Sequence, residues 1–107
     1  MKEYKSKPTS FEFQWDDRKE ALNILKHGIS FSAASYVFTD ENRVEMYDES
    51  HSLYEDRYIV LGFVSKLLFV VYTERDDAIR LISARIATRE EEEIYNEYNK
   101  GSNTTGR

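Results

Sequence analysis

Residues 72–86 read YTERDDAIRLISARI and predict a β-hairpin, with Asp76-Asp77 as its two-residue turn. Most of this stretch is apolar enough to belong to a hydrophobic core. Arg75, Arg80 and Arg85 interrupt the pattern, and a buried guanidinium must be paired because removing charge from water is costly. These arginines therefore either form a structural ion-pair network or make up a binding site for an anion.

Strand parity bears on that choice. Strict alternation places Arg80 and Arg85 on opposite faces of the hairpin, unless a β-bulge intervenes. In the functional interpretation the guanidinium groups clamp the charge of a phosphate. In the structural interpretation they pair with nearby carboxylates such as Glu55, Glu74 or Asp76. Spacing alone favours the structural alternative.

The rest of the chain can be assigned outward from this hairpin. Strands are predicted at residues 11–15, 44–47, 57–64, 67–74 and 79–86, with a polar loop over 48–56. A helix runs to about Lys26 and ends at Gly28, and Ser30 begins a shorter second helix. Thr88 and Glu91 form a capping box for a last helix to about Asn99. This order predicts an α+β two-layer domain with two N-terminal helices, an antiparallel β-sheet meander and a C-terminal helix.

Length and composition limit the class of protein. With 107 residues we expect a single domain over 1–107, in which 1–10 form a flexible leader, 11–99 the globular part and 100–107 a flexible tail. The chain has no cysteine, its longest apolar run is residues 67–72, and the N-terminus lacks a signal-peptide pattern. We therefore expect a cytoplasmic protein without a membrane span.

The net charge of −5 argues mildly against nucleic-acid binding, which needs clustered Lys and Arg. The charge is uneven, however. Acids gather in residues 40–56 and 90–93, and bases gather near Lys19, near Lys26 and along residues 75–89. A local basic cleft on an acidic protein is consistent with this distribution.

Two further groups of residues could carry chemistry. Lys26 and His27 end a helix, where bases are favourable for purely electrostatic reasons, but an imidazole there could also transfer a proton. Glu55 in the acidic loop could act as a general base or orient an arginine. His51 lies in the same loop and is interpreted as solvated. Two isolated histidines and no tight carboxylate cluster predict no metal site and no cofactor.

The aromatic residues are mostly explained by a core. Helical spacing accounts for Tyr95 and Tyr98, although either ring could stack on a nucleobase.

As a set, these motifs resemble the BrnT family of toxins from bacterial type II toxin–antitoxin systems. The resemblance spans residues 11–95. The segments that carry it are Phe13-x-Trp15-Asp16 with Lys19 and Asn23, Lys26-His27-Gly28-Ile29-Ser30-Phe31 with Ala34 and Phe38, Glu55-Asp56-Arg57 with Gly62, residues 71–75, residues 79–85, and residues 87–91 leading to Tyr95.

The resemblance implies a RelE-like fold and a metal-independent ribonuclease that inhibits translation. It also implies a cognate BrnA-like antitoxin, which neutralises the toxin in a 2:2 assembly. The toxin would contact operator DNA only through this antitoxin. By position, the polar signature of the family falls on Lys26, His27, Arg75, Arg80 and Arg85, without settling their individual roles.

Metal-free RNA cleavage needs a base, an acid and cations for the phosphorane charge. We therefore expect Arg75, Arg80 and Arg85 to stabilise charge, His27 or Glu55 to transfer the proton, and Lys26 to contact phosphate. RNA-binding roles are expected for Lys19, Arg57 and Tyr95. The alternative is a non-enzymatic module whose acidic face binds a basic partner. Cleavage specificity and ribosome dependence do not follow from the sequence.

Overall fold

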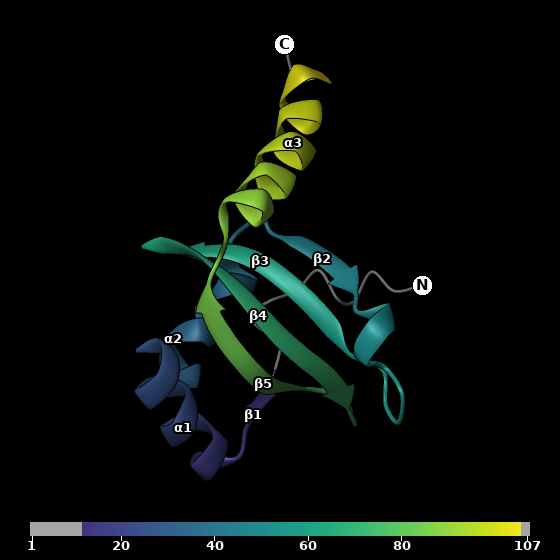
Figure 1. Ribbon diagram of the computed structural model, residues 1–107. Helices are drawn as coiled ribbons and strands as arrows, with labels where there is room; N and C mark the ends of the chain where they lie inside the picture. Colours follow the sequence, from purple (N-terminus) through teal and green to yellow (C-terminus); the bar gives the residue numbers. More distant parts are fainter. Residues whose placement is uncertain (1–11, 106–107) are drawn as a thin grey trace.

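The structure is a computed structural model that describes residues 12–105, with side chains described for residues 12–100. Figure 1 shows a twisted sheet with two helices on one side and a third helix rising from one end. In chain order the elements are β1 (Glu12–Gln14), α1 (Asp17–His27), α2 (Phe31–Ala34), η3 (Ser35–Thr39), β2 (Val44–Tyr47), η4 (Glu49–His51), β3 (Tyr58–Val64), β4 (Lys66–Arg75), β5 (Ala78–Ile86) and α3 (Arg89–Thr105).

The five strands form one sheet in the order β1-β5-β4-β3-β2. The antiparallel meander predicted for β2 to β5 is confirmed, but the sheet as a whole is mixed because β1 pairs with β5 in parallel. The two N-terminal helices carry the chain from β1 across to the far edge of the sheet. The meander then returns to β1, so that β5 arrives beside it in the same direction. Hydrophobic alternation in three residues could not reveal that pairing.

Local signals set the ends of α1. The Asp16 carboxylate accepts hydrogen bonds from the backbone N–H groups of Arg18 and Lys19, at 2.8 and 3.1 Å. These two bonds lower the pKa of the Asp16 carboxyl. At the other end Gly28 has φ 73°, a left-handed conformation that glycine adopts without strain.

The second helix is shorter and tighter than its sequence pattern predicts. Ser30 caps α2 as expected, with its Oγ accepting from the N–H of Ala33 at 3.0 Å, but α2 has one turn and continues as the 3-10 helix η3. Gly62 explains how closely η3 approaches β3, since a Cβ at that glycine would lie 2.8 Å from the Cβ of Val37.

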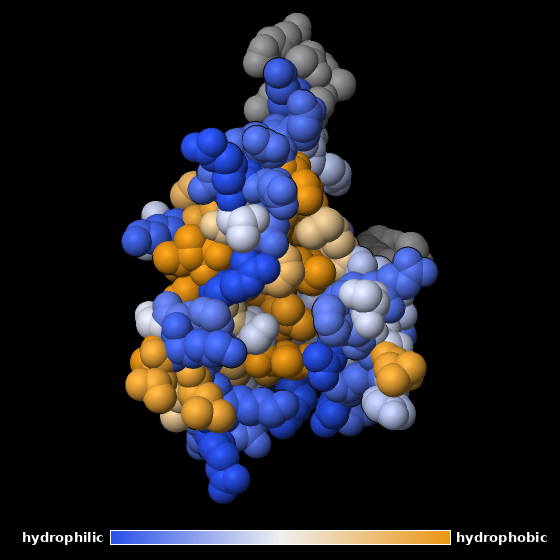
Figure 2. All heavy atoms as spheres, in the orientation of Figure 1, coloured by the Kyte–Doolittle hydropathy of each residue, from blue (hydrophilic) through white to orange (hydrophobic). Residues whose placement is uncertain are grey.

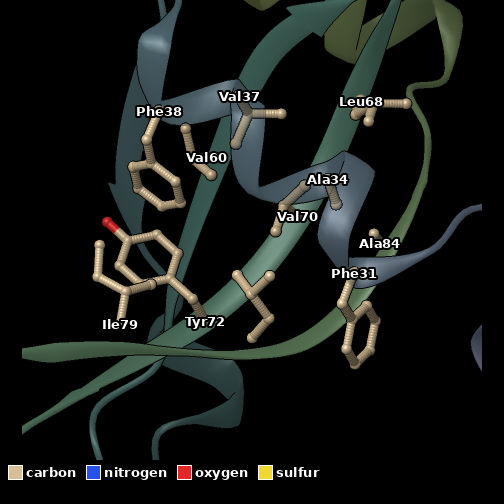
Figure 3. Close-up of a cluster of buried hydrophobic side chains, with 11 residues drawn as sticks. Phe31, Ala34, Val37, Phe38, Val60, Leu68, Val70, Tyr72, Ile79 and Ala84 are labelled. Atoms are coloured by element: carbon tan, nitrogen blue, oxygen red, sulfur yellow. The ribbon is translucent and has the colours of Figure 1, made fainter. Parts of the chain in front are cut away.

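Two apolar clusters cover the two faces of the sheet. The first fills the space between the sheet and the segment α2–η3, where Phe31 and Phe38 meet Val70 and Tyr72 (Figure 3). The second is smaller and packs Tyr95 of α3 against the opposite face. We call that opposite face, which points away from α1 and α2, the open face, because among the described helices α3 alone covers part of it, at one end.

The last helix extends further than predicted. Its capping box is confirmed, because Glu91 Oε1 accepts from the N–H of Thr88 and Thr88 Oγ1 accepts from the N–H of Glu91. The helix continues to Thr105, whereas the sequence predicts an end near Asn99 and a flexible tail from residue 100. The predicted leader over 1–10 lies outside the described residues. No described helix combines the length and apolarity that crossing a bilayer requires.

Candidate active site

A β-bulge in β5 decides which arginines share a face. Val71 of β4 pairs with Ser83, but the next residue, Tyr72, pairs with Leu81. Ile82 is therefore the extra residue on β5, and the alternation of its side chains shifts by one position there.

The shift places Arg80 on the same side of the sheet as Arg85. Leu81 and Ala84 both lie in the first core cluster, although strict alternation over three positions would put them on opposite faces. Arg80, Ser83 and Arg85 consequently share the open face. Strict alternation would separate Arg80 from Arg85, and the β-bulge, named above as the exception, brings them onto one face.

The open face carries a hollow of about 480 Å³, which we call the open-face hollow. Apolar side chains from the three central strands form its floor, and charged or polar side chains form its rim. Figure 2 looks at this face and shows apolar side chains along its middle with hydrophilic ones on both sides. The lining residues are Asp48, Ser50, His51, Arg57, Ile59, Phe69, Val71, Ile82, Ser83 and Arg85.

The loop between β2 and β3 is closed by its own hydrogen bonds. The N–H of Asp48 donates to the carbonyl of Arg57 at 2.8 Å, which joins the two ends of the loop. Between them, the Ser52 hydroxyl donates to the carbonyl of Asp48 at 2.6 Å and accepts from the N–H of Arg57 at 2.9 Å. The loop thereby holds His51 and Arg57 at a defined edge of the hollow.

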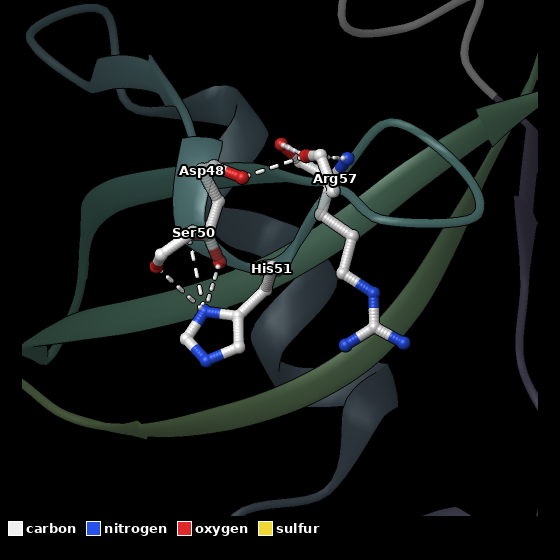
Figure 4. Close-up of polar contacts among 5 residues, drawn as sticks. Asp48, Ser50, His51 and Arg57 are labelled. Atoms are coloured by element: carbon white, nitrogen blue, oxygen red, sulfur yellow. Dashed lines mark hydrogen bonds and ion pairs between the residues drawn. The ribbon is translucent and has the colours of Figure 1, made fainter.

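His51 is paired with a carboxylate. Its Nδ1 lies 3.1 Å from Asp48 Oδ2 and 3.2 Å from the Ser50 hydroxyl. The Asp48 side chain is 11% exposed and that of His51 is 68% exposed, so a shielded carboxylate orients an accessible ring. Figure 4 shows Nδ1 directed at Asp48 and Ser50 with the other ring nitrogen pointing away from them. An Nδ1–H held by a carboxylate leaves Nε2 as a proton acceptor.

Arg57 connects the open-face hollow to a second one. The second hollow shares His51 and Arg57 and adds Glu55 and Arg75. Glu55 Oε1 accepts from Arg75 Nη2 at 3.1 Å across a partly exposed ion pair. Among the described residues, no carboxylate pairs with the Arg57 guanidinium, which leaves its donors available to an anion.

Arg85 is held from two sides. Its Nη1 and Nη2 each donate to a different carboxylate oxygen of Glu91 at 2.9 Å, and its guanidinium carbon lies 3.9 Å from the centre of the Phe69 ring. Burial disfavours a charged Glu91, but the hydrogen bonds from Arg85 and from the N–H of Thr88 outweigh it and lower the pKa of the Glu91 carboxyl. Arg85 therefore ties α3 to the sheet while it lines the hollow.

Arg80 lies further along the same face. It pairs across strands with Thr73 on one side and with Gln14 of β1 on the other, and it is partly buried. Among the side chains of residues 12–100 it has no ion-pair partner.

The remaining predicted site residues lie elsewhere. Lys19, Lys26 and His27 are on α1, which packs on the other side of the sheet through Asn23. Tyr95 is 7% exposed, and its hydroxyl donates to Asp40 at 2.6 Å, so the described conformation gives a nucleobase no ring face for stacking. Burial and the Asp40 carboxylate raise the pKa of the Tyr95 hydroxyl.

Sequence reasoning missed Asp48, Ser50 and Ser83 and set His51 aside as solvated. His51 is indeed exposed, but it is paired as well. The spacing Asp48-x-x-His51 was the available signal, because one turn of helix brings residues three apart together. The bulge at Ile82 had no signal of its own in the sequence.

Acid–base and electrostatic chemistry are what these residues can perform. Among the described residues, no three His, Cys, Asp or Glu side chains gather as a metal-ion site would require. The open-face hollow instead offers a carboxylate-bound imidazole beside guanidinium groups.

Comparisons with known proteins also point to a ribonuclease family. A protein-family model described as "Ribonuclease toxin, BrnT, of type II toxin-antitoxin system" matches residues 15–91. The 1.1 Å crystal structure of the Brucella abortus ribonuclease toxin BrnT superposes with a TM-score of 0.60 at 21% sequence identity, covering 75% of this chain and 100% of that one. At this identity the likeness concerns the fold. No curated protein matches the chain.

Proposed function

Since this chain belongs to the BrnT family of ribonuclease toxins of type II toxin–antitoxin systems, we propose that it is an endoribonuclease that cleaves RNA on the open face of its sheet without a metal ion. Cleavage of cellular RNA then inhibits translation. Both the metal independence and the effect on translation are parts of this proposal.

One observation carries the assignment of the site. The Asp48–His51 pair, the Arg57 guanidinium and the Arg85 guanidinium line the same hollow, although they come from a loop, a strand entrance and the end of another strand. A proton acceptor beside fixed cations is the combination that phosphodiester cleavage requires.

The reaction follows from that arrangement. His51 Nε2 takes the proton of a ribose 2′-hydroxyl, and the 2′-oxygen attacks the adjacent phosphorus. The bond from phosphorus to the 5′-oxygen breaks, and the departing 5′-oxygen takes a proton from solvent water. The products are a 2′,3′-cyclic phosphate and a 5′-hydroxyl end. Asp48 holds the ring and stabilises the imidazolium that forms. DNA is not cleaved because it lacks the attacking hydroxyl.

Arginines supply the positive charge. Arg57 and Arg85 face the phosphorane charge in the hollow, Arg80 extends the cationic surface, and Arg75, oriented by Glu55, binds the next stretch of RNA backbone. This local cluster offsets the net charge of −5 where RNA approaches.

The partner follows from the family. A type II toxin has an antitoxin partner, and we propose a BrnA-like DNA-binding protein that neutralises this toxin in a 2:2 complex and brings it to operator DNA. The RelE-like relationship of the fold belongs to the same proposal.

The test is cleavage of a defined RNA in the presence of excess EDTA. Wild-type protein should cut it and leave 2′,3′-cyclic phosphate ends, and a substrate with a 2′-deoxyribose at the cut site should resist. His51→Ala should remove the activity while the circular dichroism spectrum stays that of the wild type.

Two outcomes would contradict the proposal. Activity that vanishes with EDTA and returns with a divalent cation would exclude the metal-independent mechanism. A wild-type protein that neither cleaves RNA nor arrests growth on induction would favour the non-enzymatic binding module.

A further inference from the structure

Helix α1 presents its aliphatic side chains to solvent. Asn23 is its one buried residue, at 6% exposure, whereas Leu22, Ile24 and Leu25 are 59%, 45% and 83% exposed. Amphipathic helices normally turn such residues toward the core. Of these three residues only Ile24 lines a hollow, and an exposed aliphatic side chain beside a hollow is typical of a protein–protein contact surface.

A hollow of about 570 Å³ adjoins one flank of this helix, and we call it the α1 hollow. Ile24 and His27 of α1 form one wall, Val64 and Lys66 at the β3–β4 turn form another, and Ile86 at the end of β5 closes it. Ile86 is 47% exposed, so the apolar surface continues from the helix across the hollow.

The α1 hollow carries positive charge, whereas the protein as a whole is negatively charged. Among the residues that the structure describes, its lining includes Lys66 and His27 but no carboxylate, on a chain with 20 acidic residues. Glu20 lies on the same side of α1, one turn before Ile24, yet its carboxylate already accepts from the N–H of Phe31 at 2.9 Å. An apolar surface with a basic rim complements an acidic amphipathic segment.

The α1 hollow and the open-face hollow are independent. They share no lining residue, and they lie on opposite faces of the sheet, since Leu68 lines the first and Phe69 the second. A partner can therefore occupy the α1 hollow without touching His51, Arg57 or Arg85.

We propose that the α1 hollow is the docking site for an acidic, amphipathic segment of the antitoxin. The inference rests on the antitoxin partnership in the proposed function but not on the catalytic assignment. Apolar side chains of the segment cover Ile24 and Ile86, and its carboxylates face Lys66. This contact anchors the partner behind the sheet.

The test compares two substitutions on the flanks of one helix. Ile24 and Leu22 are both exposed aliphatic residues, but about 200° of helix rotation separates them, so only Ile24 lines the hollow. Affinity is measured by biolayer interferometry, with the purified cognate antitoxin as the probe.

Ile24→Glu should raise the Kd for that probe roughly 30-fold, the scale of a central interface residue. Lys66→Glu should slow association and reduce its dependence on salt concentration, as removal of a rim charge does. Leu22→Glu should change the Kd less than about 3-fold, and all three variants should cleave RNA at the wild-type rate when the probe is absent.

Equal affinity of Ile24→Glu and wild type, or equal losses for Ile24→Glu and Leu22→Glu, would overturn the proposal. So would a wild-type dimer in light scattering that Ile24→Glu converts to a monomer with unchanged affinity for the probe, because the occupant would then be a second copy. If the wild-type protein cuts no RNA but Ile24→Glu still weakens binding of the probe, the ribonuclease mechanism is contradicted and the docking site is supported.

Discussion

The two histidines of this chain lie in regions that differ in what surrounds them. His27 ends α1 behind the sheet, beside aliphatic side chains and Lys66. His51 ends the short helix η4 on the open face, with its Nδ1 on Asp48 and with Arg57 beside the same hollow. Both are basic groups in the last turn of a helix, so local context makes them look alike. Only the second one meets the charges that a phosphodiester reaction needs.

The comparison indicates that convergence, and not the residue type, identifies the site. The open face collects side chains from the 48–57 loop, β3, β4 and β5. The α1 end collects apolar surface and positive charge without a carboxylate-bound imidazole. We therefore assign chemistry to the first region and partner binding to the second. Four experiments probe these two regions.

The largest effect should come from His51, and each histidine is replaced by asparagine in a separate variant. His51→Asn removes the proton acceptor and should lower kcat for RNA cleavage roughly 10²–10⁴-fold. His27→Asn should change kcat less than about 2-fold. Single-turnover cleavage of one RNA checks both. The opposite ranking would return the proton-transfer role to His27, as the family resemblance allowed.

Charge stabilisation gives the next effect. Arg57→Ala should lower kcat about 10²-fold. Among the described residues the Arg57 guanidinium has no carboxylate partner, so its charge is available to stabilise the transition state. Arg57→Lys should recover little of it, since an ammonium cannot donate in a fork. Lys26→Ala on α1 serves as the matched loss of one positive charge. A reduction by Lys26→Ala as large as that by Arg57→Ala would show that overall charge, and not position, governs activity.

Substitutions in the α1 region should instead change the stability of the fold. The Asn23 amide donates to the carbonyls of Ile29 and Ala84 and accepts from the N–H of Ala84. Asn23→Ala leaves these partly or fully buried groups unpaired and should lower the free energy of unfolding by about 3 kcal/mol. Urea denaturation measures this. Leu22→Ala, one residue away and exposed, should cost under about 1 kcal/mol.

The smallest effect concerns acid and the attachment of α3 to the open face. The folded-state pKa of Glu91 is lowered below its ordinary value of 4.5, so its ionised form stabilises the fold above that value. This contribution is lost as the pH falls through the lowered pKa. Hydrogen exchange of the backbone amides at the start of α3 should accelerate there. Glu91→Gln should exchange faster at neutral pH and lack the acid step, and an unchanged acid step in this variant would assign it to another carboxyl group.

Much of the architecture was accessible from the sequence. Period-two alternation located β2 to β5 within one residue at each end, and Ser30, Gly28 and the Thr88–Glu91 pair marked helix boundaries correctly. These signals are local, since each depends on residues within one turn or one strand. The parallel pairing of β1 is non-local and was missed, as was the change of α2 into a 3-10 helix.

The candidate site was accessible only in part. Arg75, Arg80 and Arg85 stand out in the sequence as charges in an apolar hairpin, whereas Glu55 is indicated by its acidic loop and Arg57 by the family resemblance. The structure places all five on the open face or its edge. His51 was set aside because nothing within a few residues reveals that β3 and β5 bring arginines beside its loop.

By itself the sequence determined the meander, the capped helices and the presence of arginines in the last hairpin, because propensity, alternation and capping act over a few neighbouring residues. The tertiary structure alone decided on which face those arginines lie, through one extra residue at Ile82. It also decided which histidine they meet. A bulge depends on how two strands pack, and a site depends on side chains far apart in the chain. Neither can therefore be predicted from the pattern of neighbouring residues.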